Sequence, residues 1–226
     1  MSMYQLIVFD VDGTFYNLDD VVQDNYDIQV AFYAAEKGLS EEAVKQIFEE
    51  NSILPYKSAK ARSATEFFLR NGVSADIWRE YRDAHTTPNS IRRETAVSSG
   101  LLAQYAELAK LALLSSNTAE NIQKTLDWLG IDRGLFGDVF CSTTKLDGCP
   151  FSKTAMIGTI LERYGVEPRA ALSVGDRYAT DIKPLVNLGG DGVLIHMPEE
   201  LKDVYSDLSS GRLGKREDTR YKFFRN

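Results

Sequence analysis

The chain has 226 residues, 43% of them hydrophobic, which is enough for one large domain or two small ones with a substantial core. Its 26 basic and 33 acidic residues leave a net charge of −7, which argues against a nucleic-acid-binding surface because such surfaces are basic. Two cysteines and two histidines are too few to favour a Cys/His zinc site.

No part of the sequence approaches the ~18 consecutive apolar residues that a membrane-spanning helix needs. The N-terminal residues MSMYQLIVFD have neither the basic segment nor the long apolar segment of a signal peptide. Cys141 and Cys149 are expected to be free thiols in a reducing compartment. We therefore expect a cytoplasmic protein that binds neither membranes nor nucleic acids.

The first predicted element is a strand over Tyr4–Phe9, and an unusual acidic sequence follows it. Asp10 ends the apolar run, and Asp12 and Gly13 come directly afterwards. Two carboxylates at the mouth of a buried strand repel each other and are costly to bury. Their position therefore favours a chemical role over a structural one.

The next predicted elements are all helices. We expect them over Asp19–Lys37 and Ser40–Glu50, after a capping box at Ser63–Glu66, and over Ser74–Ala84. About 75 residues of helix are far more than an ordinary connection between two strands contains. The sequence therefore predicts an all-α domain at residues 17–91, inserted into a core formed by residues 1–16 and 92–226.

After the insertion, apolar runs alternate with helical patterns. Strands are predicted over Leu111–Ser115, Asp138–Cys141, Ala170–Val174 and Gly192–His196, and helices over Ser99–Ala109, Thr118–Leu129 and Ser152–Tyr164. Short, uniformly apolar strands separated by helices are typical of buried parallel sheets. The predicted fold class is thus α/β, a doubly wound, parallel, five-stranded Rossmann-like sheet with an inserted helical domain.

Polar residues follow several of these strands, and parallel strands all end at the same edge of a sheet. Such an edge would gather Asp10 and Asp12 with Ser116, Asn117, Lys153, Asp176 and Asp181. Crowded carboxylates require a cation, and hard oxygen ligands favour Mg²⁺. Gly13 allows the backbone beside it to turn and present amides to a phosphate, to which Ser116 and Lys153 could also bind.

In this order, Asp-x-Asp-Gly-Thr at 10–14, Ser-Asn at 116–117, a lysine, and Gly-Asp-x-x-x-Thr-Asp at 175–181 resemble the four motifs of the haloacid dehalogenase superfamily. The resemblance is to the phosphatase branch, spans residues 4–197, and extends to the helical insertion, which resembles the C1 cap of that superfamily. It implies a Mg²⁺-dependent phosphatase that acts on a small phosphorylated metabolite.

The resemblance also implies a role for each motif residue. Asp10 would be the nucleophile that forms an aspartyl-phosphate, and Asp12 would be the general acid and then the base. The metal would be held by Asp10, the backbone carbonyl of Asp12 and Asp176, with Asp181 binding directly or through water. The phosphoryl group would be bound by Gly13, Thr14, Ser116, Asn117 and Lys153.

Several alternatives remain open at this point. Lys145 is the second choice for the phosphate-binding lysine. Selectivity would come from the helical insertion, where Lys57, Lys60 and Arg62 are expected to contact an acidic or aromatic leaving group together with Tyr16, although a solvated basic face explains the three cations equally well. The substrate would resemble that of a nucleotidase or of a phosphoglycolate phosphatase.

Two rival functions share the same sequence features. One is a phosphotransferase such as a sugar-phosphate mutase, which uses the same residues but disfavours water as the acceptor. The other is a non-catalytic binding module that retains the fold. A monomer and a homodimer are both compatible with the sequence.

Overall fold

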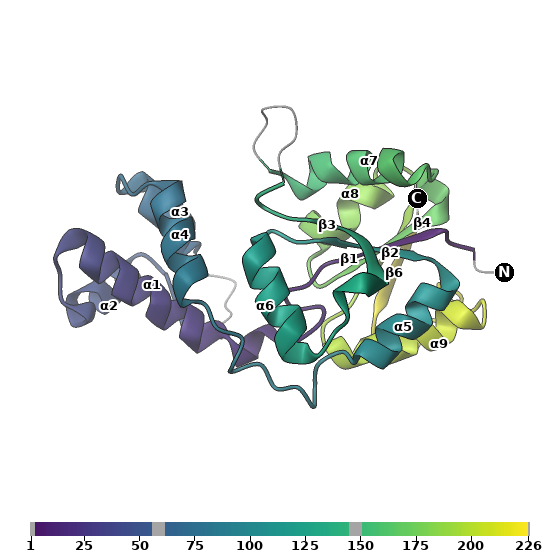
Figure 1. Cartoon of the computed structure of the whole chain (residues 1–226), viewed down its shortest axis with the longest axis horizontal. Helices are drawn as coiled ribbons and strands as arrows, with labels where there is room; N and C mark the ends of the chain where they lie inside the picture. The colour runs from purple at the N-terminus through teal and green to yellow at the C-terminus, as the bar shows by residue number, and fades with distance from the viewer. Residues whose placement is uncertain (1–2, 56–61, 145–150, 226) are drawn as a thin grey trace. The chain divides into compact units, whose positions relative to one another are not determined.

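The computed structural model describes residues 3–55, 62–144 and 151–225. The chain divides into two compact units (Figure 1). The core unit consists of Met1–Asn17 and Arg92–Asn226, and the helical unit consists of Leu18–Ile91. Among the described residues, no helix is both long enough and apolar enough to cross a membrane.

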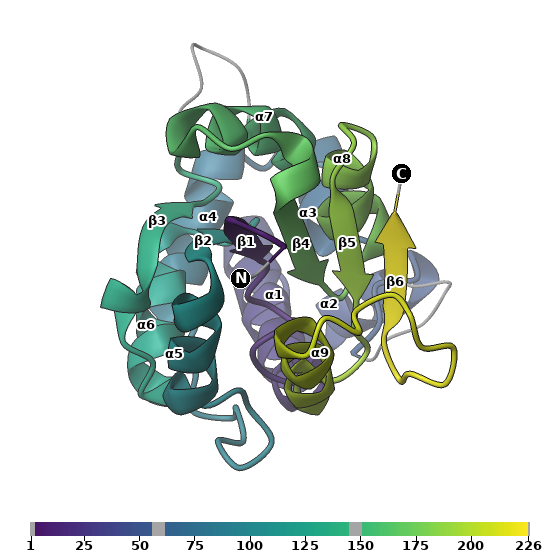
Figure 2. The same ribbon diagram turned by 90° about the vertical axis from the view of Figure 1, so that its right-hand side faces the viewer.

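The core unit is built on one six-stranded sheet with the order β3-β2-β1-β4-β5-β6 (Figure 2). The strands are β1 (Leu6–Phe9), β2 (Lys110–Leu114), β3 (Phe136–Phe140), β4 (Ala171–Gly175), β5 (Asp191–Leu194) and β6 (Lys222–Arg225). The first five run parallel, with β1 at the centre between β2 and β4. This arrangement confirms the predicted α/β class and the parallel sheet.

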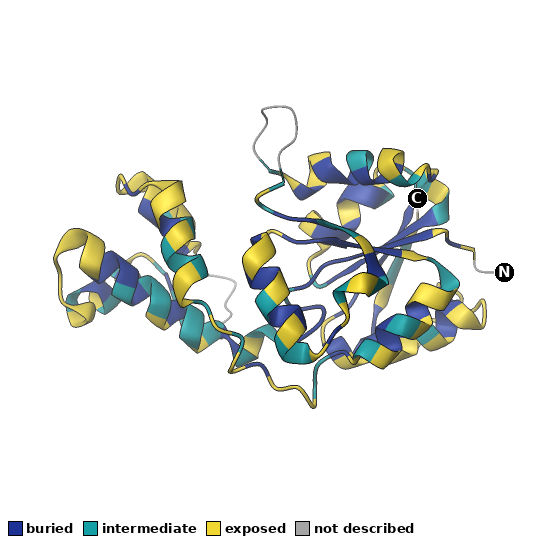
Figure 3. Ribbon diagram, viewed as in Figure 1, coloured by how far each residue is buried: buried dark blue, intermediate teal, exposed yellow. Residues whose placement is uncertain are grey.

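Helices cover both faces of the sheet (Figures 1 and 2). One face carries α5 (Ser99–Leu108), α6 (Ala119–Leu129) and α9 (Leu201–Ser209), and the other carries α7 (Lys153–Tyr164) and α8 (Lys183–Val186). Every residue of β1 is therefore almost fully buried, and the central strands are mostly dark blue in Figure 3. Burial on two faces explains why the strand sequences are apolar without alternation.

The sixth strand corrects the predicted count of five. β6 pairs antiparallel with β5 at the edge of the sheet. Its sequence, KFFR, is short and half exposed, so neither apolar continuity nor alternation marks it as a strand. Contacts distant in the sequence hold it in place, because Arg225 pairs at 3.1 Å with the buried Asp191, which also accepts a 2.5 Å hydrogen bond from Tyr4.

The helical unit contains α1 (Val22–Lys37), α2 (Glu41–Glu50), α3 (Ala64–Arg70) and α4 (Ala75–His85), close to the predicted ranges. Serines cap three of these helices, since the side chains of Ser40, Ser63 and Ser74 each accept a hydrogen bond from a backbone N–H of the first turn. The unit has its own aromatic core, formed by Tyr26, Phe32, Tyr33, Phe48, Phe68 and Trp78.

Candidate active site

The register of the three central strands brings their carboxyl ends together. Phe9, the last residue of β1, pairs with Leu113 of β2 on one side and with Val174 of β4 on the other. The backbone N–H of Asp10 still donates to the carbonyl of Val174 at 2.9 Å, so this aspartate is fixed by the sheet itself. Residues that follow these strands therefore share one edge, where the strand order changes direction and ligands bind in such folds.

A buried lysine joins two of the predicted acids across this edge. Lys153 is the first residue of α7, and its Nζ donates to Asp10 Oδ1 at 2.6 Å and to Asp181 Oδ1 at 2.7 Å. All three side chains are less than 10% exposed. The structure thus brings Lys153 into the site, while the alternative Lys145 lies outside the described residues.

Ser152 precedes Lys153 at the N-terminal end of α7 without a side-chain capping bond. The first N–H groups of a helix have no partner within the helix, and those of α7 lie at the same edge as Lys153. Such N–H groups and the helix dipole favour an anion there.

Burial sets the electrostatics of this cluster. It raises the pKa of Asp10, and the positive charge of Lys153 offsets only part of that effect while Asp181 adds to it. Burial alone would lower the pKa of Lys153, but the two carboxylates outweigh it and the net direction is upward. The lysine is therefore held in its charged form, and one cation is too little for the surrounding acids.

Asp10, Asp176 and Asp181 form a group of acids that fits a divalent cation. Each offers a carboxylate oxygen, and the three oxygens lie within 4.8 Å of one another. A set made only of oxygen donors suits Mg²⁺ better than a softer metal. The carboxylate of Asp12 is not part of this group and has other partners, and the prediction for Asp12 concerns its backbone carbonyl as a metal ligand.

The loop after β4 is shaped for the close approach of its acids. Asp181 lies on a π-helical turn, Tyr178–Ile182, an irregularity that is frequent at functional sites. A Cβ atom at Gly175 would lie 2.5 Å from the Cβ of Asp181, so only glycine fits beneath this side chain. The backbone N–H of Arg177 donates to Asp181 Oδ2 at 2.9 Å and fixes its orientation.

Asp12 is held by three hydrogen-bond donors. Its Oδ1 accepts from the hydroxyl of Tyr16 at 2.6 Å and from Nδ2 of Asn117 at 3.4 Å, and its Oδ2 accepts from Ser115 Oγ at 3.1 Å. Gly13, with φ at +85°, allows the chain to turn directly after Asp12. The two acids of the first motif therefore have separate surroundings, one ionic and one made of neutral donors.

The serine at the end of the second strand is a residue that the sequence analysis missed. Ser115 is fully buried, donates to Asp12 and accepts from the N–H of Asn117 at 3.0 Å, whereas the predicted Ser116 is exposed. The prediction placed Ser115 inside the strand, but β2 ends at Leu114. Ser115 is therefore the first residue after its strand, as Asp10 is after β1.

Thr14, predicted to bind phosphate, is fully buried directly after the turn at Gly13. Its backbone N–H donates to the carbonyl of Val11 at 3.2 Å, which stabilises that turn.

Of the four residues predicted to contact the substrate, the structure describes Tyr16 and Arg62. Lys57 and Lys60 lie outside the described residues. Tyr16 is 5% exposed and directs its hydroxyl to Asp12, so the structure shows it as a partner of that acid.

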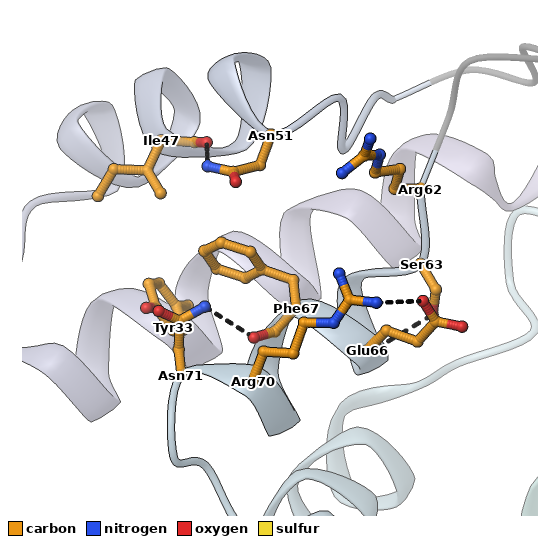
Figure 4. A pocket seen from close by; sticks show the side chains of 9 residues that line it. All are labelled: Tyr33, Ile47, Asn51, Arg62, Ser63, Glu66, Phe67, Arg70 and Asn71. Carbon is orange, nitrogen blue, oxygen red and sulfur yellow. Dashed lines mark hydrogen bonds and ion pairs between the residues drawn. The ribbon is translucent and has the colours of Figure 1, made fainter.

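Arg62 lines a pocket of about 370 Å³ within the helical unit (Figure 4). Residues of α2 and α3, including Phe67 and Arg70, surround the same pocket. Arg62 is exposed there. Exposed arginines beside an aromatic ring suit an anionic group on an apolar ligand.

Solved structures of similar fold include phosphatases and a dehalogenase. A HAD phosphatase from Thermococcus onnurineus aligns with a TM-score of 0.57 and 18% identity, covering 88% of this chain and 97% of that one. A predicted phosphoglycolate phosphatase from Haemophilus somnus aligns with a TM-score of 0.51 and 20% identity, covering 85% of each chain. A 2-haloacid dehalogenase from Pseudomonas syringae aligns with a TM-score of 0.53 and 17% identity, covering 90% of this chain and 98% of that one.

At these identities the similarities establish the fold and leave the reaction open. A search of curated protein sequences found no significant match. The sequence profile of the haloacid dehalogenase-like hydrolases, however, matches residues 7–190. This range includes the four acids of the site, Asp10, Asp12, Asp176 and Asp181, and the buried Lys153. The chain therefore belongs to the haloacid dehalogenase-like hydrolase family.

Proposed function

We propose that the protein is a Mg²⁺-dependent phosphatase that hydrolyses a small phosphate monoester through an aspartyl-phosphate. The observation that carries this proposal is the separate placement of the two acids of the first motif. Asp10 lies among the acids and the lysine of the charged cluster, while Asp12 lies among neutral donors beside it. One carboxylate suits attack at phosphorus, and the other suits proton transfer.

The first step transfers the phosphoryl group to the protein. A carboxylate oxygen of Asp10 attacks phosphorus, the bond from phosphorus to the ester oxygen breaks, and the proton of Asp12 moves to that departing oxygen. The charge of Lys153 and the hydroxyl of Ser115 are suited to hold the phosphoryl oxygens during the transfer.

The second step returns the protein to its starting state. Asp12, now a carboxylate, takes a proton from water as the water oxygen attacks phosphorus, and the bond between phosphorus and Asp10 breaks to release phosphate.

The remaining predicted residues have supporting roles in this proposal. Bound Mg²⁺ would neutralise negative charge on the phosphoryl oxygens and on the acids. Asp10, Asp176 and Asp181 would hold it with the backbone carbonyl of Asp12. Backbone amides at the turn through Gly13 and Thr14, and the side chain of Asn117, would bind the phosphate.

The acid at position 12 distinguishes this chain from relatives that cleave carbon–halogen bonds. The resemblance to the superfamily implies that its dehalogenases carry no acid at the equivalent position and use no Mg²⁺. An aspartate there, held by three donors, favours a reaction in which an oxygen leaving group needs a proton. It also favours catalysis over a binding module, for which the acid has no evident use.

The leaving group is proposed to carry negative charge or an aromatic ring. Arg62, Arg70 and Glu66 line the pocket of the helical unit with Phe67, and Arg70 pairs with Glu66 at 3.8 Å. The guanidinium of Arg62 beside the ring is therefore the group suited to such a leaving group. Arg62→Ala is expected to raise KM for anionic esters and to leave KM for neutral alkyl esters unchanged. If the substitution leaves KM unchanged for anionic as well as for neutral esters, Arg62 does not bind the leaving group.

A panel of phosphate monoesters tests the proposed reaction. Wild-type protein with Mg²⁺ is expected to release free phosphate from at least one ester, and both EDTA and Asp10→Asn are expected to abolish the release. Isomerised product without free phosphate would favour the phosphotransferase alternative. The absence of any turnover across the panel would favour a binding module.

A further inference from the structure

Tyr16 stands out among the residues of the core unit that the proposed reaction does not use. Its side chain is 5% exposed, and its hydroxyl has a side-chain carboxylate as its acceptor. It donates to Asp12 Oδ1 at 2.6 Å, the shortest of the three hydrogen bonds to that carboxylate. A buried tyrosine therefore contacts the acid that the proposed mechanism uses for proton transfer.

We propose that Tyr16 is a positioning residue that fixes Asp12 for proton donation to the leaving oxygen. The inference rests on the proposed function and adds a residue to it. The contact is local and rigid, because residues 12 and 16 also form a backbone bridge across the turn at Gly13. The two ends of the hydrogen bond are thus tied together by the main chain as well as by the side chains.

The hydroxyl of Tyr16 acts through Asp12, because Oδ1 of that carboxylate accepts its 2.6 Å hydrogen bond. Tyr16 is the donor in this contact, and Asp12 is the group that the proposed mechanism uses to move the proton.

A donor to Oδ1 affects the transfer in two ways. It fixes the rotation of the carboxyl group, so that the other oxygen, Oδ2, which contacts Ser115, faces a constant direction. It also becomes stronger as Asp12 loses its proton, because a hydrogen bond to a carboxylate is stronger than one to a neutral acid. Both effects assist the step in which the leaving oxygen takes the proton.

This mechanism makes the effect of Tyr16 depend on the leaving group. An alkoxide needs protonation as it departs, whereas p-nitrophenolate is stable without it. Tyr16→Phe removes only the hydroxyl and is expected to lower kcat for an alkyl phosphate by about tenfold or more, within the range that general acid catalysis contributes. For p-nitrophenyl phosphate kcat is expected to change by less than about threefold, with KM unchanged for both esters.

Tyr4→Phe is the matched control. Tyr4 is also a buried tyrosine whose hydroxyl donates to an aspartate, Asp191 at 2.5 Å, but it precedes the first residue of β1, away from the strand ends that carry the site. This control is expected to change kcat equally for the two esters. Urea midpoints of both variants show whether each one is folded under the assay conditions.

A double-mutant cycle provides the second measurement. With the alkyl phosphate, Tyr16→Phe is expected to lower the wild-type rate by about tenfold or more, but to have no further effect on the residual rate in the background of Asp12→Asn, which abolishes proton donation. Equal losses with the two esters, a change in KM alone, or full additivity in the cycle would each overturn the role of Tyr16. Failure of the wild type to hydrolyse either ester would instead overturn the proposed function.

Discussion

Lys153→Met is expected to destabilise the core unit strongly when no divalent cation is present. The substitution keeps a side chain of similar length and removes the only charge that contacts both Asp10 and Asp181 among the described residues. Two buried carboxylates then face each other without a cation. Removing one partner of a buried ion pair costs about 3–5 kcal/mol, because the remaining charge stays buried and uncompensated.

Arg163→Met is the control on the same helix. Arg163 also pairs with an aspartate, Asp138 at 2.6 Å, but its side chain is 61% exposed. An exposed pair of this kind contributes about 0–1 kcal/mol. With a urea slope of about 2–3 kcal/mol per molar, the buried substitution lowers the midpoint by about 1–2.5 M and the exposed one by less than about 0.5 M.

The assay is urea unfolding in EDTA and again in millimolar Mg²⁺. In EDTA the urea midpoint of Lys153→Met is expected to fall by more than that of Arg163→Met, each by the shift given above. Mg²⁺ is expected to restore part of the loss in Lys153→Met and to leave Arg163→Met unchanged, because only the first variant leaves uncompensated acids beside the proposed metal site. Equal midpoints for the two variants in EDTA would refute the reasoning.

Four further substitutions test the loop after β4, the serine after β2 and a buried acid of the core unit. Gly175→Ala places a Cβ 2.5 Å from a buried aspartate side chain and is expected to lower the free energy of unfolding by about 1–3 kcal/mol and to lower activity, as measured by urea unfolding and phosphate release. Ser115→Ala is expected to reduce turnover by at least about tenfold, while Ser116→Ala changes it by less than about twofold, because only the first side chain contacts the acid of the site. Burial alone would raise the pKa of Asp207, but a hydrogen bond from Tyr221 and nearby arginines lower it overall. The stability that this shift contributes is present above about pH 4 and is lost as the pH falls through the lower folded value, so the difference in urea midpoint between wild type and Asp207→Asn is expected to shrink below about pH 4.

The parallel sheet could be predicted because its rules act locally. Uniformly apolar runs mark strands buried on both faces, and parallel strands end at one edge, so residues far apart in the sequence could be assigned to one site. Asp10 and Asp181 are separated by most of the chain, yet both contact Lys153. Lys153 itself could be placed because it opens a helix whose end is marked by Gly165.

What the sequence did not reveal depends on single-residue boundaries and on distant contacts. Ser115 was assigned to the strand because nothing in the run LALLSS marks the residue at which pairing stops. Strand β6 pairs with β5, and its Arg225 contacts Asp191, but no local pattern in the sequence indicates either contact. The hydroxyl of Tyr16 could have faced a substrate on sequence grounds, and only the turn at Gly13 directs it back to Asp12.

The most direct test of the account is to trap the phosphorylated protein. Turnover of an active ester is stopped with acid, and the peptides are analysed for an acyl-phosphate that hydroxylamine removes. The account predicts one phosphoryl group on the peptide that contains Asp10, and none in Asp10→Asn. Phosphate release at the wild-type rate from Asp10→Asn, or a phosphoryl group on another residue, would contradict it.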